Sequence, residues 1–194
     1  MTLAFAFICP MRAVSLSFLS LLFFIGAFNI ILSASCREIF LVYGVAMKPM
    51  LSRRKFYLLS WTWGLPLNLL GGLVALCLLL LGYRPKRWDY CYYFEIGHNW
   101  GGTELGMFFL TQKDSHPLIK CHEQGHGIQN CYWGFLMPLV VSIPSALRYW
   151  YRMLILWLDK DRYRKLAPYD TAWFEGQATR LGLELHRQLR AGRE

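Results

Sequence analysis

Two long segments without a single charged residue limit the fold of this chain more than any other feature. Residues 56–83 form an uncharged, largely apolar run of 28 positions, and residues 15–34 form a second run of 20. About 20 apolar residues are enough for a helix to cross the hydrocarbon core of a bilayer. Because only helices satisfy their own backbone groups in lipid, we expect both runs to be transmembrane helices. The longer helix should be kinked at Pro66 and anchored at the interface by Trp61 and Trp63.

The composition agrees with a membrane location. Of the 194 residues, 55% are apolar and 17% are charged, whereas soluble domains contain about a quarter charged residues. Apolar side chains at this frequency can outweigh the chain entropy, so disorder is excluded, and the length allows one domain with a membrane segment. A third apolar stretch, residues 135–147, has two prolines in 13 positions. It is too short to span a bilayer, and we expect it to be re-entrant, interfacial or buried.

The N-terminal part is expected to be an extension or an anchor. Met47 and Met50 stand just before the basic sequence LSRRKF and the longer run, which is how a short membrane protein often begins. We therefore interpret residues 1–46 as an N-terminal extension whose apolar run is an anchor helix. A cleaved signal peptide is the alternative, but 20 unbroken apolar residues exceed the usual signal core. Residues 47–87 then hold the transmembrane segment, and residues 88–194 form a membrane-associated domain with the metal site.

Basic residues flank the longer run on both sides and predict opposite topologies. The segment between the two runs carries five Lys and Arg residues against one acid, which places it in the cytoplasm by the positive-inside rule. Arg84, Lys86 and Arg87 follow the longer run and favour the reverse orientation. The larger cluster predicts that residues from position 88 onward lie on the outer side.

The residues that indicate chemistry are His122, Glu123 and His126, which form an H-E-x-x-H pattern. On a helix, residues four positions apart share one face, with their Cβ atoms about 5–6 Å apart, so two imidazoles can bind one metal ion. Glu123 lies at the edge of that face, where its carboxylate can take a proton from water activated by zinc. The alternative is a helix with two polar histidines, but such residues are costly beside membrane segments unless they are paired or functional. Gly125 and Gly127 are poor helix formers and allow another element or a substrate to approach closely.

A third protein ligand is expected, because catalytic zinc usually has three protein ligands and one open position. A helical pattern extends over residues 170–189, and Glu175 shares one face of it with small residues. A carboxylate in that setting can lie against the histidine-bearing helix, so Glu175 is the predicted ligand. Asp170 and Glu184 are the alternatives.

The sequence resembles two groups of known proteins. The histidine pair followed by E-x-x-A at 175–178 resembles the gluzincin arrangement of zinc peptidases. Residues 50–185 as a whole resemble a family of small bacterial membrane proteins with such a site. The motifs that carry this resemblance are W-G-L-P at 63–66, N-L-L-G at 68–71, W-G-G-x-x-L-G at 100–106, H-E-x-G-H-x-x-Q at 122–129, I-P-S at 143–145 and F-E-G-Q-A-T at 174–179. The resemblance implies an integral protein of the bacterial inner membrane with a metallopeptidase site, and it implies no particular substrate.

The glycine-rich segment 98–110 predicts a strand or a β-hairpin before the H-E-x-x-H helix. In zinc peptidases a strand in this place commonly binds the substrate backbone by edge pairing, and an ordinary structural hairpin is the alternative. His98 could donate a proton, although such a residue is more often a polar part of a loop. His116 and His186 are expected to face solvent.

Several aromatic and basic residues downstream are further candidates. Arg148 and Arg152 lie one helical turn apart among aromatic residues, where they could bind lipid phosphate or a substrate carboxylate. Tyr149, Tyr151 and Tyr169 are candidates for stabilising an oxyanion, and the sequence does not rank them.

Other classes of site are not indicated. The basic charges of residues 148–194 are spread out and mixed with acids, which argues against nucleic-acid binding. No phosphate-binding loop, nucleophile elbow or dinucleotide fingerprint is present. Cys121 and Cys131 are ten positions apart, a separation that fits no zinc-knuckle pattern.

The sequence therefore predicts a mainly α-helical membrane protein with a short β-hairpin or strand before the H-E-x-x-H helix. Its predicted function is that of a membrane-bound zinc metallopeptidase, in which activated water attacks a peptide bond. The expected partners are membrane lipids and a peptide or protein substrate. The alternative is a non-catalytic membrane assembly factor or adaptor with a structural metal site.

Overall fold

A computed structural model describes residues 51–192 of the chain. The chain divides into two units, Met1–Met47 and Lys48–Glu194, and all described residues belong to the second. The predicted extension and its apolar run at 15–34 lie outside the described residues.

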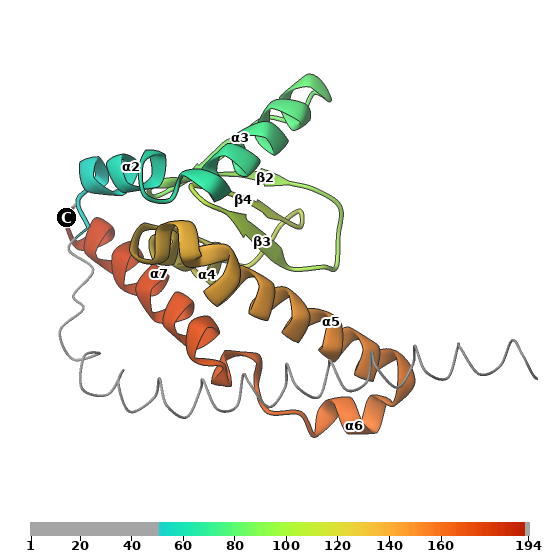
Figure 1. The fold of residues 1–194 in the computed structure, drawn as a ribbon. Helices are drawn as coiled ribbons and strands as arrows, with labels where there is room; N and C mark the ends of the chain where they lie inside the picture. Colours follow the sequence, from blue (N-terminus) through green and yellow to red (C-terminus); the bar gives the residue numbers. More distant parts are fainter. Residues whose placement is uncertain (1–50, 193–194) are drawn as a thin grey trace, which may run out of the picture. The chain divides into compact units, whose positions relative to one another are not determined.

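The second unit is mainly helical and contains one small sheet (Figure 1). In chain order its elements are α2 (Arg53–Trp61), α3 (Leu65–Leu80), β1 (Lys86–Trp88), β2 (Cys91–Glu95), β3 (Gly102–Leu105), β4 (Phe108–Thr111), α4 (Pro117–Trp133), the 3₁₀ turn η1 (Gly134–Leu136), the π-helical turn η2 (Pro138–Ser142), α5 (Ile143–Leu158), α6 (Lys160–Arg164), the 3₁₀ turn η3 (Tyr169–Thr171) and α7 (Trp173–Ala191). The mainly α class is confirmed.

The predicted hairpin is present as β3 and β4, and it belongs to a larger mixed sheet. The strand order is β1-β2-β4-β3, in which β2 and β4 are parallel and the other two pairs are antiparallel. Gly106 makes the β3–β4 turn with φ of 76°, a conformation that favours glycine. β3 therefore lies at an edge of the sheet, paired on one side by β4.

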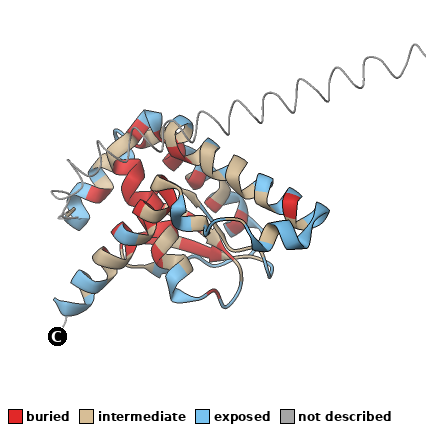
Figure 2. Cartoon of the chain, turned by 90° about the horizontal axis from the view of Figure 1, so that it is seen from below, coloured by how far each residue is buried: buried red, intermediate tan, exposed pale blue. Residues whose placement is uncertain are grey.

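Both faces of the sheet are covered by helices. Phe94, Phe108 and Leu110 point to one face and pack with Ala75 and Leu78 of α3. The alternating positions point to the other face, as expected for the period of two in a strand. There they join a core shared with α2, α4 and α7, whose members include Phe56, Tyr93, Phe109, Ile128 and Leu181. Figure 2 shows the buried residues concentrated in the middle of the fold and the C-terminal end of α7 exposed.

The long run predicted as a single transmembrane helix is two helices. Pro66 has no amide proton to donate and lies in the first turn of α3. Gly64 ends the connection from α2, and its carbonyl accepts a hydrogen bond from Asn130 Nδ2 at 3.2 Å. Asn68 of α3 is fully buried and is hydrogen-bonded to two other segments. Its Oδ1 accepts from Met107 N, just before β4, at 2.6 Å, and its Nδ2 donates to Ser60 O of α2. In place of the expected kink, α2 and α3 are separated by a bend of 92°, and these contacts stabilise it.

Among residues 51–192, no single helix is both long and apolar enough to cross a membrane. Two bent pairs meet the length and composition criteria together, α2 with α3 and Pro117–Leu136 with Pro138–Leu158. The third predicted stretch, 135–147, forms η1, η2 and the start of α5, with Met137 and Val141 buried and Leu139 exposed.

Candidate metal centre

Helix α4 carries the H-E-x-x-H residues, as predicted. It begins after His116, whose Nδ1 accepts a hydrogen bond from Leu118 N at 3.2 Å, and Pro117 occupies the first turn. Both features stabilise a helix start. From Glu123 to Cys131 every residue of α4 is buried, so the helix is the centre of the unit.

The predicted third ligand lies on α7, which packs directly on α4. Gly125 and Gly182 face the partner helix so closely that an added Cβ would overlap the Ala178 and Cys121 carbonyl oxygens. The absence of side chains at these two positions allows the backbones to approach, and Glu175 then faces the histidines. Gly125 therefore admits a neighbouring helix, one of the two roles predicted for it, and Gly127 lies against the β3–β4 turn.

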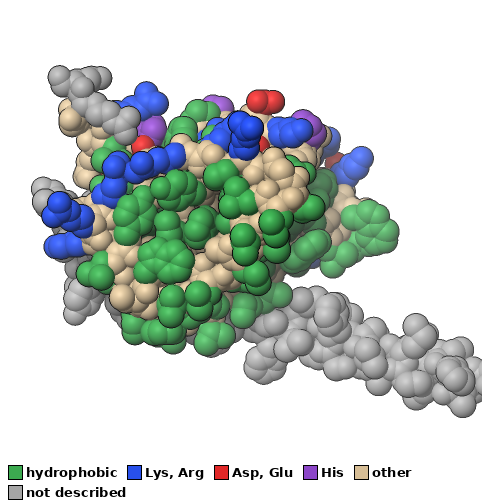
Figure 3. Space-filling view, turned by 90° about the horizontal axis from the view of Figure 1, so that it is seen from above, with side chains coloured by type: hydrophobic (Ala, Val, Ile, Leu, Met, Phe, Trp, Pro, Cys, Tyr) green, Lys and Arg blue, Asp and Glu red, His purple; other side chains and the backbone are tan. Residues whose placement is uncertain are grey.

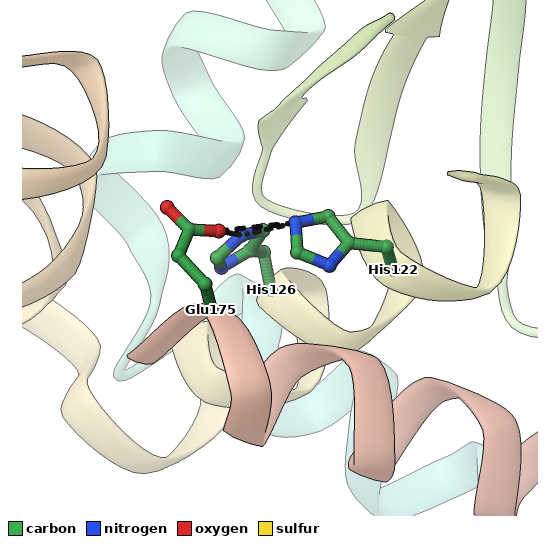
Figure 4. A group of neighbouring side chains, drawn as sticks. All are labelled: His122, His126 and Glu175. Carbon is green, nitrogen blue, oxygen red and sulfur yellow. Dashed lines mark hydrogen bonds and ion pairs between the residues drawn. The ribbon is translucent and has the colours of Figure 1, made fainter. Parts of the chain in front are cut away.

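Three predicted ligand atoms form a nearly equilateral triangle (Figure 4). His122 Nε2 and His126 Nε2 are 3.1 Å apart, and they lie 3.1 Å and 3.2 Å from Glu175 Oε2. The side chain of Glu175 is fully buried, that of His126 is 8% exposed and that of His122 is 19% exposed. The three atoms thus meet at a point that remains partly open on the side of His122.

Hydrogen bonds on the far side of each imidazole determine its tautomer. Thr179 Oγ1 donates to the Glu175 carbonyl at 3.2 Å, so it accepts from His122 Nδ1 at 2.9 Å. Gln129 Nε2 donates to Phe174 O at 2.8 Å, so Gln129 Oε1 accepts from His126 Nδ1 at 2.7 Å. A neutral imidazole has only one N–H, and each histidine uses it on Nδ1.

When both imidazoles are neutral, the two Nε2 atoms therefore present lone pairs to each other and to a carboxylate oxygen. Three electron-rich atoms at about 3.1 Å repel one another unless a cation lies among them. Such an arrangement, with the other ring nitrogen held by a hydrogen bond, is typical of metal-binding histidines.

The geometry of the triangle fits a metal ion. Bonds of about 2.1 Å separate neighbouring ligand atoms by about 3.4 Å in a tetrahedron and about 3.0 Å in an octahedron, and the observed distances lie between these values. Glu175 Oε1 is buried without a hydrogen-bond partner, which is unusual for a carboxylate. Burial acts to raise the pKa of Glu175, but the neighbouring His122 and His126 lower it well below the ordinary range, so the group is an anion. The buried His122, His126 and Glu175 group could hold a metal ion.

Glu123 lies beside this group and against the edge strand. A Cβ on Gly102 of β3 would approach Glu123 Oε1 to 2.6 Å, so the strand backbone and the carboxylate are in contact. Burial raises the pKa of Glu123, and the neighbouring His122 and His126 oppose that shift. A carboxylate with a raised pKa is a better proton acceptor near neutral pH than an ordinary glutamate.

The structure distinguishes among the candidate tyrosines. Tyr169 is next to the centre: its hydroxyl lies 3.5 Å from Ser145 Oγ, and the charge of Glu175, together with burial, raises its pKa. The phenol is therefore neutral and able to donate a hydrogen bond. The loop at 167–171 is held by Arg148, which donates to the Tyr169 and Pro168 carbonyls, and by Arg152, which donates to Ala167 O. Both arginines thus bind protein groups, a role that the sequence did not indicate.

The remaining candidates lie elsewhere. His98 and His116 are exposed, and neither is in the metal-binding group. His186 does not face solvent as expected, because its Nδ1 bonds Asp89 Oδ2 at 2.7 Å and its ring stacks on Trp88. Asp170, Glu184, Cys121 and Cys131 do not belong to the group either.

Sequence reasoning missed the residues that orient the ligands. Gln129 follows His126 by three positions and Thr179 follows Glu175 by four, so helical spacing places each beside its partner and could have indicated both. Gly102 had no comparable signal, because its role depends on strand placement.

The comparisons with known proteins give no relative: no protein-family model, no curated protein and no solved structure matches the chain.

Proposed function

We propose that the protein is a membrane-associated zinc peptidase in which His122, His126 and Glu175 hold the metal and Glu123 is the general base. The observation that carries this proposal is the convergence of His122 Nε2, His126 Nε2 and Glu175 Oε2 within 3.2 Å of one another. A set of three protein ligands leaves one position open for water or substrate, which is the pattern of catalytic zinc sites, whereas structural sites have four.

Zinc is favoured over iron by the position of Glu123. Two histidines and a carboxylate also suit a non-haem iron centre, but iron oxygenases have no need of a second, non-ligating glutamate beside the metal. In a hydrolase that glutamate has a defined task, because water must lose a proton as it attacks.

In this mechanism, bound zinc would supply Lewis acidity that lowers the pKa of water and polarises the peptide carbonyl. Glu123 accepts a proton from the water as the new carbon–oxygen bond forms. It then donates that proton to the leaving amine as the carbon–nitrogen bond breaks. The neutral Tyr169 phenol is available to donate a hydrogen bond to the oxygen that gains charge.

Strand β3 is suited to hold an extended substrate. It is an edge strand whose partner on one side is β4, so its free edge can pair with a peptide backbone. Because Gly102 touches Glu123, a peptide paired with β3 would pass within reach of the base.

The test combines metal content with cleavage. The full chain is purified in detergent without chelators, its zinc and iron are measured, and cleavage of a diverse mixture of internally quenched peptides is followed. Glu123→Gln should retain zinc and lose cleavage by about 10²–10⁴-fold, the usual contribution of a general base. Glu184→Gln, a change of the same kind on α7, should retain both zinc and cleavage.

Two results would contradict the proposal. Wild-type protein that contains no zinc after purification would contradict the proposed metal centre. Cleavage by Glu123→Gln at the wild-type rate would contradict the role of Glu123 as the general base. If Glu123→Gln also leaves the biological effect of the protein unchanged in cells, the alternative of a non-catalytic assembly factor or adaptor is favoured.

A further inference from the structure

We propose that α2 and α3 form an apolar wedge, residues 53–80, that enters an anionic lipid bilayer and returns to the same side without crossing it. The proposal rests on the membrane association proposed above but not on the chemistry of the metal centre.

The first observation is that the start of the uncharged run lies against Tyr90, a residue that follows the end of the run. The Arg53 guanidinium lies 5.6 Å from the centre of the Tyr90 ring, and the Phe56 and Tyr90 rings are also 5.6 Å apart. Tyr57 donates from its hydroxyl to Tyr90 O at 3.0 Å. A straight helix of 28 residues would be about 42 Å long, and the seven residues from 84 to 90, at about 3.4 Å each, could not bring Tyr90 back to its start. In this proposal residues 53 and 90 lie on one side of the bilayer, whereas the basic clusters alone predict that residues from 88 onward lie on the opposite side from residue 53.

The second observation is that α3 is apolar on all sides. Its inner face, with Leu67, Ala75 and Leu78, is buried on the sheet and neighbouring turns. Its outer face consists of leucines and Cys77, and Leu73 and Leu80 are 59% and 80% exposed. A helix in contact with water on its outer face normally carries polar residues there, and one that is hydrophobic all round is buried in protein or lipid. α2 and α3 are uppermost in Figure 1, and Figure 3 shows a broad hydrophobic area on that side.

The third observation is the positive charge around the wedge, which indicates that an anionic bilayer covers its apolar surface. Exposed cations stand at both ends of the wedge: Arg53, Arg54 and Lys55 in its first turn, and Arg84 and Arg87 after it. Figure 3 shows Lys and Arg side chains along one edge of the hydrophobic area. Anionic headgroups attract such clusters of cations. A second copy of the chain docked here around a twofold axis would instead bring like charges together.

A same-side wedge also removes the conflict between the two basic clusters. A spanning helix would leave one cluster on the non-cytoplasmic side, against the positive-inside rule. A wedge keeps both on the cytoplasmic side.

The first experiment measures the environment of α3 in the full chain. Cys77 is exposed on α3, whereas the other three described cysteines are buried. In a Cys9→Ser, Cys36→Ser background, Cys77 is labelled with a nitroxide and the protein is bound to vesicles rich in phosphatidylglycerol. The label should be accessible to oxygen and inaccessible to a water-soluble nickel chelate. A label on Asp161→Cys in α6, with Cys77→Ser, should show the reverse.

The second experiment determines sidedness. Ser52→Cys and Arg84→Cys, each with Cys77→Ser in the same background, are expressed in bacteria and treated with a membrane-impermeant maleimide in spheroplasts and in inverted membrane vesicles. The wedge predicts that both positions react in the same preparation and are protected in the other.

Other outcomes overturn the inference in distinguishable ways. Opposite reactivity of positions 52 and 84 means that the segment spans the bilayer. A Cys77 label in water on vesicle-bound protein means that the outer face is not in lipid, and strong coupling between Cys77 labels in detergent means that a second copy covers it. Failure to bind vesicles at all would also refute the membrane association in the proposed function.

Discussion

Gln129 is the residue on which the orientation of His126 depends. It is fully buried, and its amide links His126 Nδ1 to Phe174 O and Gln177 Oε1. Because its Nε2 is committed to donating, its oxygen is the atom left for the imidazole N–H. The lone pair of His126 Nε2 is therefore directed at the ligand triangle by a residue that would not touch the metal.

We expect Gln129→Leu to weaken zinc binding by about 10–100-fold, the usual effect of removing such a partner. Leucine has a similar volume but cannot accept from Nδ1, so the ring is free to rotate and change tautomer. Competition with a fluorescent zinc chelator gives the affinity, and Gln188→Leu at an exposed position of α7 is the control. Unchanged affinity in Gln129→Leu would show that the imidazole is oriented by other contacts.

Gly102 determines the position of Glu123 in a comparable way. An added methyl group would overlap the end of the Glu123 side chain rather than backbone, so the carboxylate can move and the fold can remain intact. We expect Gly102→Ala to reduce peptide cleavage by about 10²-fold, as for a displacement of about 1 Å, and to leave zinc binding unchanged. Thr103→Ala, on the same strand with an exposed side chain, should cleave at the wild-type rate. A fully active Gly102→Ala would mean that Glu123 works from another position.

At the scale of elements, the site depends on how closely α4 and α7 cross. An added Cβ on Gly182 would overlap the carbonyl oxygen of Cys121, which is backbone and cannot turn aside. We expect Gly182→Ala to lower the free energy of unfolding by about 1–3 kcal/mol through overpacking. Zinc affinity should fall with it, because Glu175 is on the displaced helix. Thermal unfolding and zinc competition measure the two effects.

Gly72→Ala on α3 is the matched control, since only a side-chain atom of Phe108 at 3.9 Å would be near its Cβ. Alanine is the better helix former by about 1 kcal/mol, so this variant should be at least as stable as the wild type. If Gly182→Ala is equally stable, the close helix contact does not determine the site.

The elements were predictable where the signal was local. Spacing within residues 117–133 and 170–189 indicated the two helices and three ligands of the centre, and the glycines indicated the β3–β4 hairpin. The break in the run at 56–83 was not predictable, because it depends on Asn68 and Asn130 contacts with distant backbone. The parallel pairing of β2 with β4 also joins segments with no local signal, and His186 is bonded to Asp89, which is remote in sequence.

At the scale of the whole molecule, the centre joins parts of the chain that are far apart. Two ligands come from α4 and the third from α7, 49 residues after His126. A metal ion held by both helices would bind the folded chain far better than the unfolded one, so it should contribute to stability through mass action. Without a cation, the three electron-rich atoms of these side chains repel one another.

Removal of the metal should therefore lower the melting temperature of the full chain in detergent. At a free zinc concentration of about 100 times Kd, the linkage is worth about 2.7 kcal/mol. For a chain of this size that corresponds to a decrease of about 5–10 °C on chelation. His122→Ala and His126→Ala should melt at the same temperature with and without zinc, because neither keeps a complete set of ligands. Glu123→Gln should respond to zinc as the wild type does, since its carboxylate is not among the ligands. A melting temperature that rises with zinc equally in wild type and His126→Ala would assign the effect to another site and leave the three-residue centre without support.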